Sequence, residues 1–171
     1  MLLLDVITYT SLIKACGITL GPKAVAAAEE IFETMQQRTN HFSTYTEPNE
    51  ITFKYLIQVH VEAIKYDNDN DHKVMNTKRI WTLFDDIFNR GMIPSMSTLK
   101  YCMQAALNTN DAEKALKIID TTKAKKKYDN YLWSSAANIL NKFNSDNNNI
   151  MRYEEDQLKF EISERRSASW L

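Results

Sequence analysis

One helical spacing recurs four times along this chain and constrains the fold more than any other feature. In four segments, core-type residues occur at positions i, i+3, i+4 and i+7, which places them on one stripe of an α-helix. The four stripes are Tyr9, Leu12, Ile13 and Cys16; Phe53, Leu56, Ile57 and His60; Leu99, Cys102, Met103 and Ala106; and Trp133, Ala136, Ala137 and Leu140. We therefore predict a core-facing helix at each of these four places.

A second helical stripe follows each of the first three, so the helices recur as pairs with a fourth pair begun. These second stripes are Val25, Ala28, Phe32 and Met35; Ile80, Leu83, Phe84 and Ile87; and Ala112, Ala115, Leu116 and Ile119. Antiparallel helix pairs stacked in series form an α-solenoid, in which each pair covers the apolar face of its neighbour. Three Gly and three Pro in 171 residues leave little turn chemistry for a many-stranded sheet. We predict an all-α protein.

Residues typical of helix ends divide the chain in the same way. Gly21 and Pro22 suit the N-cap and the first residue of a helix, and Gly91 suits a helix end. Asn110 has capping-box spacing with Glu113, so we predict that Asn110 is the N-cap of the helix that follows.

Two polar segments are predicted as loops. "QRTNHFSTYTEPNE", residues 37–50, joins the first helix pair to the second, and the Asn/Asp-rich "KYDNDNDHKVMNTK", residues 65–78, separates the helices of the second pair. Their extra length makes the repeats uneven. The first stripe residues, Tyr9, Phe53, Leu99 and Trp133, are separated by 44, 46 and 34 residues. Insertions in loops cost little because closure entropy grows slowly with loop length.

Several motifs in order resemble the pentatricopeptide repeat family. "DVITYTSLIKAC", "AAEEIFETM", "EPNEITFKYLI" and "RIWTLFDDIFNRGMIPS" are similar to that family's pattern VVTYNTLI, then A-x-x-LF-x-x-M, then G-x-x-P-D. The W-x2-LG-x2-Y spacing of tetratricopeptide repeats is not found. The resemblance implies an α-solenoid that forms a right-handed superhelix. Its units would be residues 5–49, 50–95 and 96–129, and residues 130–171 would hold a partial repeat and a charged C-terminal helix.

The resemblance implies that the chain binds single-stranded RNA, because these solenoids read about one base per repeat. In the family, base choice depends on the residue after the first stripe residue and on the last residue of the unit. Carried over, these pairs are Thr10 with Asn49, Lys54 with Ser95, Lys100 with Asp129 or Asn130, and Ser134 without a visible partner. Thr with Asn resembles an adenine-favouring pair. Lysine at the other two positions suggests contact with phosphate instead.

Further polar and apolar residues complete the predicted RNA-binding face. Four residues after each first reading position, on the same helix face, lie Lys14, Gln58, Gln104 and Asn138. Ile7, Ile51, Ser97 and Tyr131 occupy the place where the family wedges a side chain against a base. Packing of these four residues at the junction between repeats is the competing interpretation, and the sequence leaves both open.

Other conspicuous residues indicate ordinary structure rather than chemistry. We expect His60 to be buried and hydrogen-bonded, and Cys16 and Cys102 to be small core residues. Asp85 and Asp86 point about 100° apart on a helix, which makes them a poor metal or acid/base pair. With no catalytic motif or metal-ligand cluster, we predict a protein that is not an enzyme and has no cofactor. The net charge of −1 excludes a broadly basic nucleic-acid binder but not a local basic face.

Two charged segments follow the third repeat. Lys123–Lys127 is predicted to end a helix, where cations are favourable, and to be solvated there or to form a basic rim. Arg152–Arg166 is predicted to be a charged capping helix with Leu158 and Ile162 on one side. No run of residues is long and apolar enough for a membrane span, so we expect no membrane partner.

Cell location and the chain ends are the remaining expectations. The family resemblance implies a mitochondrion or plastid, although no Arg-rich targeting segment precedes the first repeat. Because the first repeat begins so close to Met1, we expect either that the chain is part of something longer or that a partner covers this end. Two alternatives to RNA binding stay open: a protein-interaction scaffold that holds other protein subunits, and the repeat arm of a larger RNA-processing nuclease.

Overall fold

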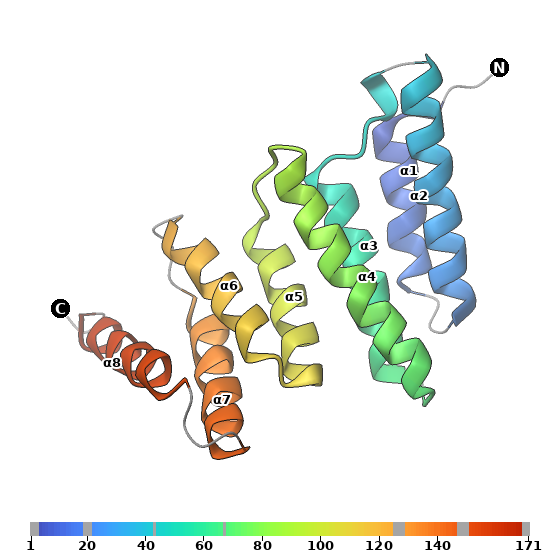
Figure 1. Cartoon of the computed structure of the whole chain (residues 1–171). Helices are drawn as coiled ribbons and strands as arrows, with labels where there is room; N and C mark the ends of the chain where they lie inside the picture. The colour runs from blue at the N-terminus through green and yellow to red at the C-terminus, as the bar shows by residue number, and fades with distance from the viewer. Residues whose placement is uncertain are drawn as a thin grey trace. The chain divides into compact units, whose positions relative to one another are not determined.

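Helices account for the secondary structure of the computed structural model, which describes residues 4–18, 22–42, 44–66, 68–124, 129–146 and 151–168 (Figure 1). The helices are α1 (Val6–Cys16), α2 (Pro22–Phe42), η1 (Thr44–Thr46), α3 (Glu50–Tyr66), α4 (Asn70–Asn89), α5 (Met96–Thr109), α6 (Ala112–Ala124), α7 (Asn130–Asp146) and α8 (Arg152–Ala168). The described residues contain no strand. The prediction of an all-α helical repeat fold is confirmed.

Helices α1, α3, α5 and α7 each begin with an N-cap side chain. Its oxygen accepts a hydrogen bond from the backbone N–H three residues further along the chain. Such a cap satisfies one of the backbone N–H groups that have no partner within the helix. The caps are Asp5 Oδ1 to Thr8 N (2.8 Å), Asn49 Oδ1 to Thr52 N (3.1 Å), Ser95 Oγ to Thr98 N (3.2 Å) and Asp129 Oδ1 to Leu132 N (3.2 Å). The predicted unit limits fall at these caps, although the division into three repeats and a partial fourth stays a prediction.

The chain forms two compact units, and the first, Met1–Cys102, contains α1 to α4 and the start of α5. In this unit α1 packs against α2 and α3, and α3 also packs against α2 and α4. The core between the first two helix pairs includes Phe32 of α2 and Phe53 of α3, whose rings meet edge to face at 5.4 Å. The first helix pair is therefore stacked on the second, as a repeat fold requires.

The second unit, Met103–Leu171, contains the rest of α5 and α6 to α8. Here α7 packs against both α6 and α8. The buried Trp133 ring of α7 lies beneath Lys123 Nζ of α6 at 5.3 Å and beneath the Arg165 guanidinium of α8 at 5.1 Å. The predicted charged helix at the C-terminal end is present as α8, with Leu158 buried and Ile162 half-buried. Residues 125–127 of the predicted basic segment lie outside the described residues.

Two residues of the first stripe are not core residues. Leu12 is 43% exposed and Cys16 is only half-buried, so the prediction was wrong at these positions. Leu12 lines an open pocket that contains residues of α1 and α2 but none of α3. The apolar stripe of α1 is therefore wider than the part of it that α2 and α3 cover.

Both predicted loops are largely helical. α2 continues to Phe42, η1 lies in the remainder of the first segment, and α4 begins at Asn70. Asp69 caps α4 by accepting from Asp71 N at 2.8 Å. The Asn/Asp-rich composition thus marks a helix start and a solvated helix face rather than a loop.

The predicted helix ends are partly correct. α2 begins at Pro22, whereas Gly21 lies outside the described residues. Gly91 follows α4 with φ of +69°, as predicted. Asn110 has φ of +53° and terminates α5, while Asp111 caps α6 through Lys114 N at 3.0 Å. The predicted N-cap was therefore wrong by one residue. Asn110 instead ends α5, since Asn is one of the few residues that readily adopt a left-handed conformation at a helix end.

Candidate nucleic-acid interface

A pocket of about 240 Å³ lies between α1 and α3. We call it the α1–α3 pocket; its lining residues are Val6, Ile7, Thr10, Ser11, Lys14, Asn49, Ile51 and Tyr55. Three of them, Thr10, Lys14 and Asn49, belong to the RNA-binding residues predicted from the sequence, and Ile7 and Ile51 are two for which base contact and packing were both left open. Residues 35 or more positions apart in the chain thus meet because α3 packs beside α1.

A chain of hydrogen bonds joins the polar residues of the pocket. Thr10 Oγ1 lies 2.8 Å from Thr52 Oγ1, and the Thr52 hydroxyl and backbone N–H both donate to Asn49 Oδ1 at 3.2 and 3.1 Å. Because Oδ1 of Asn49 faces the end of α3, the amide nitrogen of the same side chain points away from it. Thr10 is only 8% exposed, so its hydroxyl fixes the wall more than it offers a free group.

The two isoleucines of the pocket are open to solvent. Ile7 is 71% exposed and Ile51 is 49% exposed. Tyr131, at the equivalent position before the fourth stripe, is 41% exposed, and Ser97 is exposed as well. Packing at the junction between repeats does not account for side chains this exposed. Contact of these side chains with a base stays a prediction.

Two lysines flank the ring of Tyr55 at the other end of the pocket. Lys54 Nζ lies 4.1 Å and Lys14 Nζ 5.3 Å from the ring centroid, both within cation–π range. Burial acts to raise the pKa of the Tyr55 hydroxyl, but the charges of Lys54 and Lys14 outweigh it and lower that pKa. The sequence analysis missed Tyr55, although its place directly after a predicted reading residue was a usable signal.

The next set of predicted residues lies where the start of α5 meets α3. Glu50 Oε1 accepts from the backbone N–H of Ser95 at 2.8 Å and from the hydroxyl of Thr98. Ser95 Oγ also lies 3.0 Å from Thr98 Oγ1, so Ser95 is held beside a carboxylate. We call this region the α3–α5 junction; Glu50, Ser95, Thr98, Glu62 and Tyr101 interact there, and Lys54, Gln58 and Lys100 belong to it by their positions along the same two helices. Burial, followed by the charge of Glu62, raises the pKa of Tyr101.

Two further groups of predicted residues lie in the second unit. The Tyr131 hydroxyl donates to Gln104 Oε1, and Gln104 Nε2 donates to Asn108 Oδ1, both at 3.3 Å. Ser134 Oγ donates to Asn130 Oδ1 at 3.3 Å, whereas Asn138 is exposed.

One predicted base-reading pair is divided between the two units. Lys100 belongs to the first unit and Asp129 to the second. Asp129, like Asn49 and Ser95, is a helix cap. This pair therefore stays a prediction.

Comparison with protein families assigns the first part of the chain. Residues 2–63 match the family model described as the pentatricopeptide repeat domain. This first part of the chain, α1, α2 and most of α3, is similar to pentatricopeptide repeats. The match spans α1 to α3, and so includes both walls of the α1–α3 pocket. A comparison with curated proteins gives no match.

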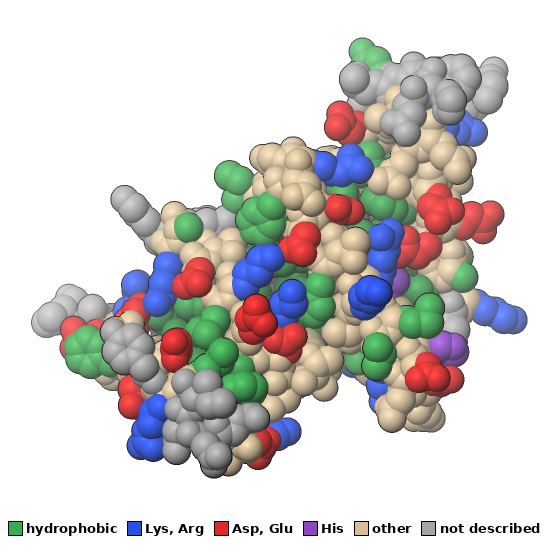
Figure 2. Space-filling view, viewed as in Figure 1, with side chains coloured by type: hydrophobic (Ala, Val, Ile, Leu, Met, Phe, Trp, Pro, Cys, Tyr) green, Lys and Arg blue, Asp and Glu red, His purple; other side chains and the backbone are tan. Residues whose placement is uncertain are grey.

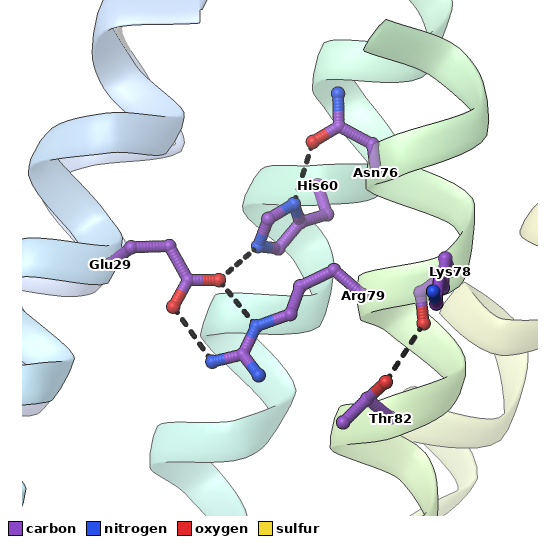
Figure 3. A network of polar contacts seen from close by, with 6 residues as sticks. All are labelled: Glu29, His60, Asn76, Lys78, Arg79 and Thr82. Atoms are coloured by element: carbon purple, nitrogen blue, oxygen red, sulfur yellow. Dashed lines mark hydrogen bonds and ion pairs between the residues drawn. The ribbon is translucent and has the colours of Figure 1, made fainter. Parts of the chain in front are cut away.

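A polar network joins α2, α3 and α4, and so links the first two helix pairs (Figure 3). The Glu29 carboxylate of α2 accepts from His60 Nε2 of α3 at 2.7 Å and from Arg79 Nε and Nη2 of α4 at 2.7 and 2.8 Å. His60 Nδ1 lies 2.8 Å from Asn76 Oδ1. The prediction of a buried, hydrogen-bonded His60 is confirmed, since its exposed fraction is 3%.

Glu29 is strongly stabilised as an anion in this network. Burial acts to raise its pKa, but the hydrogen bonds from His60 and Arg79 and the charge of Arg79 outweigh burial and lower the pKa to about 2. The sequence analysis missed Glu29, Asn76 and Arg79, because none of them lies on a predicted stripe. The pairing depends on which helix faces are brought together by stacking.

Other kinds of site find no support in the described part of the chain. The His, Cys, Asp and Glu residues described by the structure form no group of three or more that could hold a metal ion. Among the helices that the structure describes, none combines the length and apolar content that crossing a membrane would require.

Proposed function

We propose that this chain binds single-stranded RNA without catalysis, and that the α1–α3 pocket receives one base. Pentatricopeptide repeats typically bind RNA at about one base per repeat. The observation that carries the proposal is that one pocket gathers two exposed isoleucines, the Asn49 amide and Lys14 from two adjacent helix pairs. An apolar slot with a few polar groups at its edge suits a flat base that also needs hydrogen bonds.

Different residues of the pocket would contact the base and select which base is bound. Ile7 and Ile51 would contact the two faces of the base, and Asn49 would offer its amide nitrogen as a donor. Thr10 fixes the wall through Thr52. The pair Thr10 with Asn49 resembles an adenine-favouring pair of the family. A preference for adenine at this position is part of the proposal.

Charge should act locally in this complex. The net charge is −1, and acidic and basic side chains are interspersed among the described residues on the face drawn in Figure 2. RNA would therefore be attracted by particular lysines rather than by the field of the whole protein. With so few repeats the affinity of this chain should be modest, and the cellular role we propose, on family grounds, is organellar RNA processing, stability or translation.

The direct test is fluorescence anisotropy with a short random-sequence RNA at low and physiological salt. The informative variant is Ile7→Ser with Ile51→Ser, since burial of an exposed isoleucine against a base contributes up to about 1.5–3 kcal/mol, so at least a 5-fold change in affinity is expected. Its matched control is Ile18→Ser with Ile93→Ser, two isoleucines that are 77% and 70% exposed outside the pocket. We expect the pocket variant to bind RNA more weakly and the control to bind as the unchanged chain does.

Two outcomes would contradict the proposal. Equal weakening by the pocket and control variants would mean that the α1–α3 pocket does not hold the base. If the unchanged chain fails to bind RNA even at low salt, RNA binding itself is wrong, and the pocket should be tested against protein partners.

A further inference from the structure

We propose that Tyr55, together with Lys14 and Lys54, forms a site for one phosphodiester group of the bound RNA. This inference rests on the proposed RNA-binding function and assigns the end of the α1–α3 pocket that the base does not occupy. It adds Tyr55, a residue outside the predicted RNA-binding set, as a direct ligand. The hydroxyl of Tyr55 would donate to a phosphate oxygen, and the two ammonium groups would supply the charge.

The first argument is convergence of donors from two helices. Lys14 comes from α1, and Lys54 and Tyr55 come from α3. Both ammonium groups are positioned by the same ring, at 5.3 and 4.1 Å from its centroid. Lys14 and Tyr55 also line the same pocket. An anion that enters this pocket would thus meet three hydrogen-bond donors.

The second argument is the lack of a competing anion. Among the described residues, neither Lys14 nor Lys54 takes part in an ion pair. This contrasts with Lys65, which lies at the other end of α3 and pairs with Glu62 at 2.9 Å. Both ammonium groups lie over the ring of Tyr55, and the lowered pKa of its hydroxyl reflects their field. An anionic ligand would complete the balance.

The third argument is the layout of the pocket along the helix axis. Ile7 and Lys14 are seven residues apart on α1, which corresponds to about 10 Å at 1.5 Å per residue. On α1 the exposed Ile7 thus lies near the helix N-terminus and Lys14 about two turns further along, whereas on α3 Lys54 and Tyr55 follow Ile51 by three and four residues. A nucleotide has the same division, with an apolar base at one end and a charged phosphate at the other. The pocket fits a nucleotide whose base contacts Ile7 and Ile51.

The experiment measures how RNA affinity of the full chain depends on salt concentration. For single strands, each phosphate contact contributes about 0.7 to the slope of log affinity against log salt. We expect Lys14→Gln to weaken binding about 3-fold to 10-fold and to lower the slope by about 0.7. Tyr55→Phe should weaken binding about 3-fold, since it removes one hydrogen bond. Lys14→Arg should keep the slope.

Matched controls separate the site from general effects of charge and ring chemistry. Lys78→Gln removes an exposed lysine on α4, and Tyr66→Phe removes a hydroxyl at the far end of α3. We expect both controls to bind with the affinity and slope of the unchanged chain. Circular dichroism and thermal unfolding should be unaltered by all of these exposed or half-buried substitutions.

The possible results are distinguishable. If the chain binds RNA but Lys14→Gln and Tyr55→Phe behave as their controls do, the phosphodiester site is wrong while the RNA-binding function stands. If the unchanged chain binds no RNA, both proposals fail. Inorganic phosphate at matched ionic strength separates the two sources of the anion. We expect it to compete no better than chloride, and strong competition would mean that the site takes free phosphate instead of an RNA backbone.

Discussion

The α1–α3 pocket and the α3–α5 junction are built from equivalent helix positions but differ in charge. The sixth residue after the N-cap is a tyrosine in both helices, Tyr55 in α3 and Tyr101 in α5. Nine residues after the N-cap, α1 has Lys14 where α3 has Gln58. The first residue after the cap is Val6 in α1 and Glu50 in α3, and only Glu50 can place a carboxylate at the next cap.

The difference in charge shifts the pKa values of the two tyrosines in opposite directions. The pKa of Tyr55 is lowered because the Lys54 and Lys14 charges outweigh burial, whereas the pKa of Tyr101 is raised by burial and by Glu62. Equivalent helix positions thus carry two lysines beside the ring at Tyr55 and a carboxylate near Tyr101. In a repeat protein, a few substitutions at fixed positions decide which junction can bind a polyanion. The family fold alone does not decide it.

The largest effect is expected from Glu29→Gln, which should disturb the helix stacking on which the comparison depends. Glu29 links α2 to His60 and Arg79, and its side chain is 21% exposed. A pKa lowered from 4.5 to about 2 corresponds to about 3 kcal/mol of stabilisation. We expect Glu29→Gln to lower the free energy of unfolding in urea by about 2–3 kcal/mol. Glu30→Gln, on the exposed neighbour, is the control and should cost less than about 0.5 kcal/mol.

The same network predicts a sign for the dependence of stability on pH. Because the folded-state pKa of Glu29 is lowered, its contribution is fully present above about pH 4.5 and is lost as the pH falls toward about 2. The difference in unfolding free energy between the unchanged chain and Glu29→Gln should therefore shrink between about pH 5 and pH 3. A difference that stays constant over this range in urea titrations would mean that the carboxylate charge is not the cause.

Glu50→Gln tests what the carboxylate does at the α3–α5 junction, and its two effects should have opposite signs. The substitution weakens the bonds from Ser95 N–H and the Thr98 hydroxyl, so we expect a loss of about 1–2 kcal/mol in the free energy of unfolding. It also removes a negative charge beside Lys54, and RNA affinity should rise about 2-fold to 3-fold. Affinity that falls together with stability would contradict the view that Glu50 opposes RNA. Glu47→Gln, an exposed carboxylate before the Asn49 cap, is the control for general charge.

Gln58→Lys should make the α3–α5 junction more like the α1–α3 pocket. It installs a lysine at the position equivalent to Lys14, next to Lys54 and Lys100 in helix register. We expect RNA affinity to rise about 2-fold at low salt and the salt slope to become steeper by about 0.7. Gln37→Lys, on an exposed position of α2, adds the same charge elsewhere and should change neither quantity as much. Equal effects of the two lysines would show that only net charge matters.

The helix register could be predicted from sequence because each stripe is anchored by a capped helix start. Phe53, Leu99 and Trp133 are all fully buried as their spacing indicated. Helix lengths could not be predicted in the same way, because polar residues such as those of residues 70–78 are equally suited to loops and to solvated helix faces. Leu12 was wrongly predicted to be buried. An apolar stripe shows which side of a helix is apolar, but not how much of that side a neighbouring helix covers.

The candidate site was predictable only in part. Thr10 and Asn49 were found through the family pattern and Lys14 through helix spacing, and the three do line one pocket. Tyr55 was not, since its role depends on Lys14 from another helix and not on a local motif. The Glu29 network escaped for the same reason: its partners lie 31 and 50 residues away in the sequence. Such contacts follow from stacking, which periodicity describes but does not specify residue by residue.

The most direct test of the central claim compares Tyr55 and Tyr101 in one experiment. The full chain would be labelled with fluorotyrosine, and the two ¹⁹F resonances would be assigned with Tyr55→Phe and Tyr101→Phe. On addition of single-stranded RNA at low salt, we predict a clear shift of the Tyr55 resonance and a much smaller shift of the Tyr101 resonance. A larger shift at Tyr101, or RNA binding that moves neither resonance, would contradict the assignment of RNA to the α1–α3 pocket.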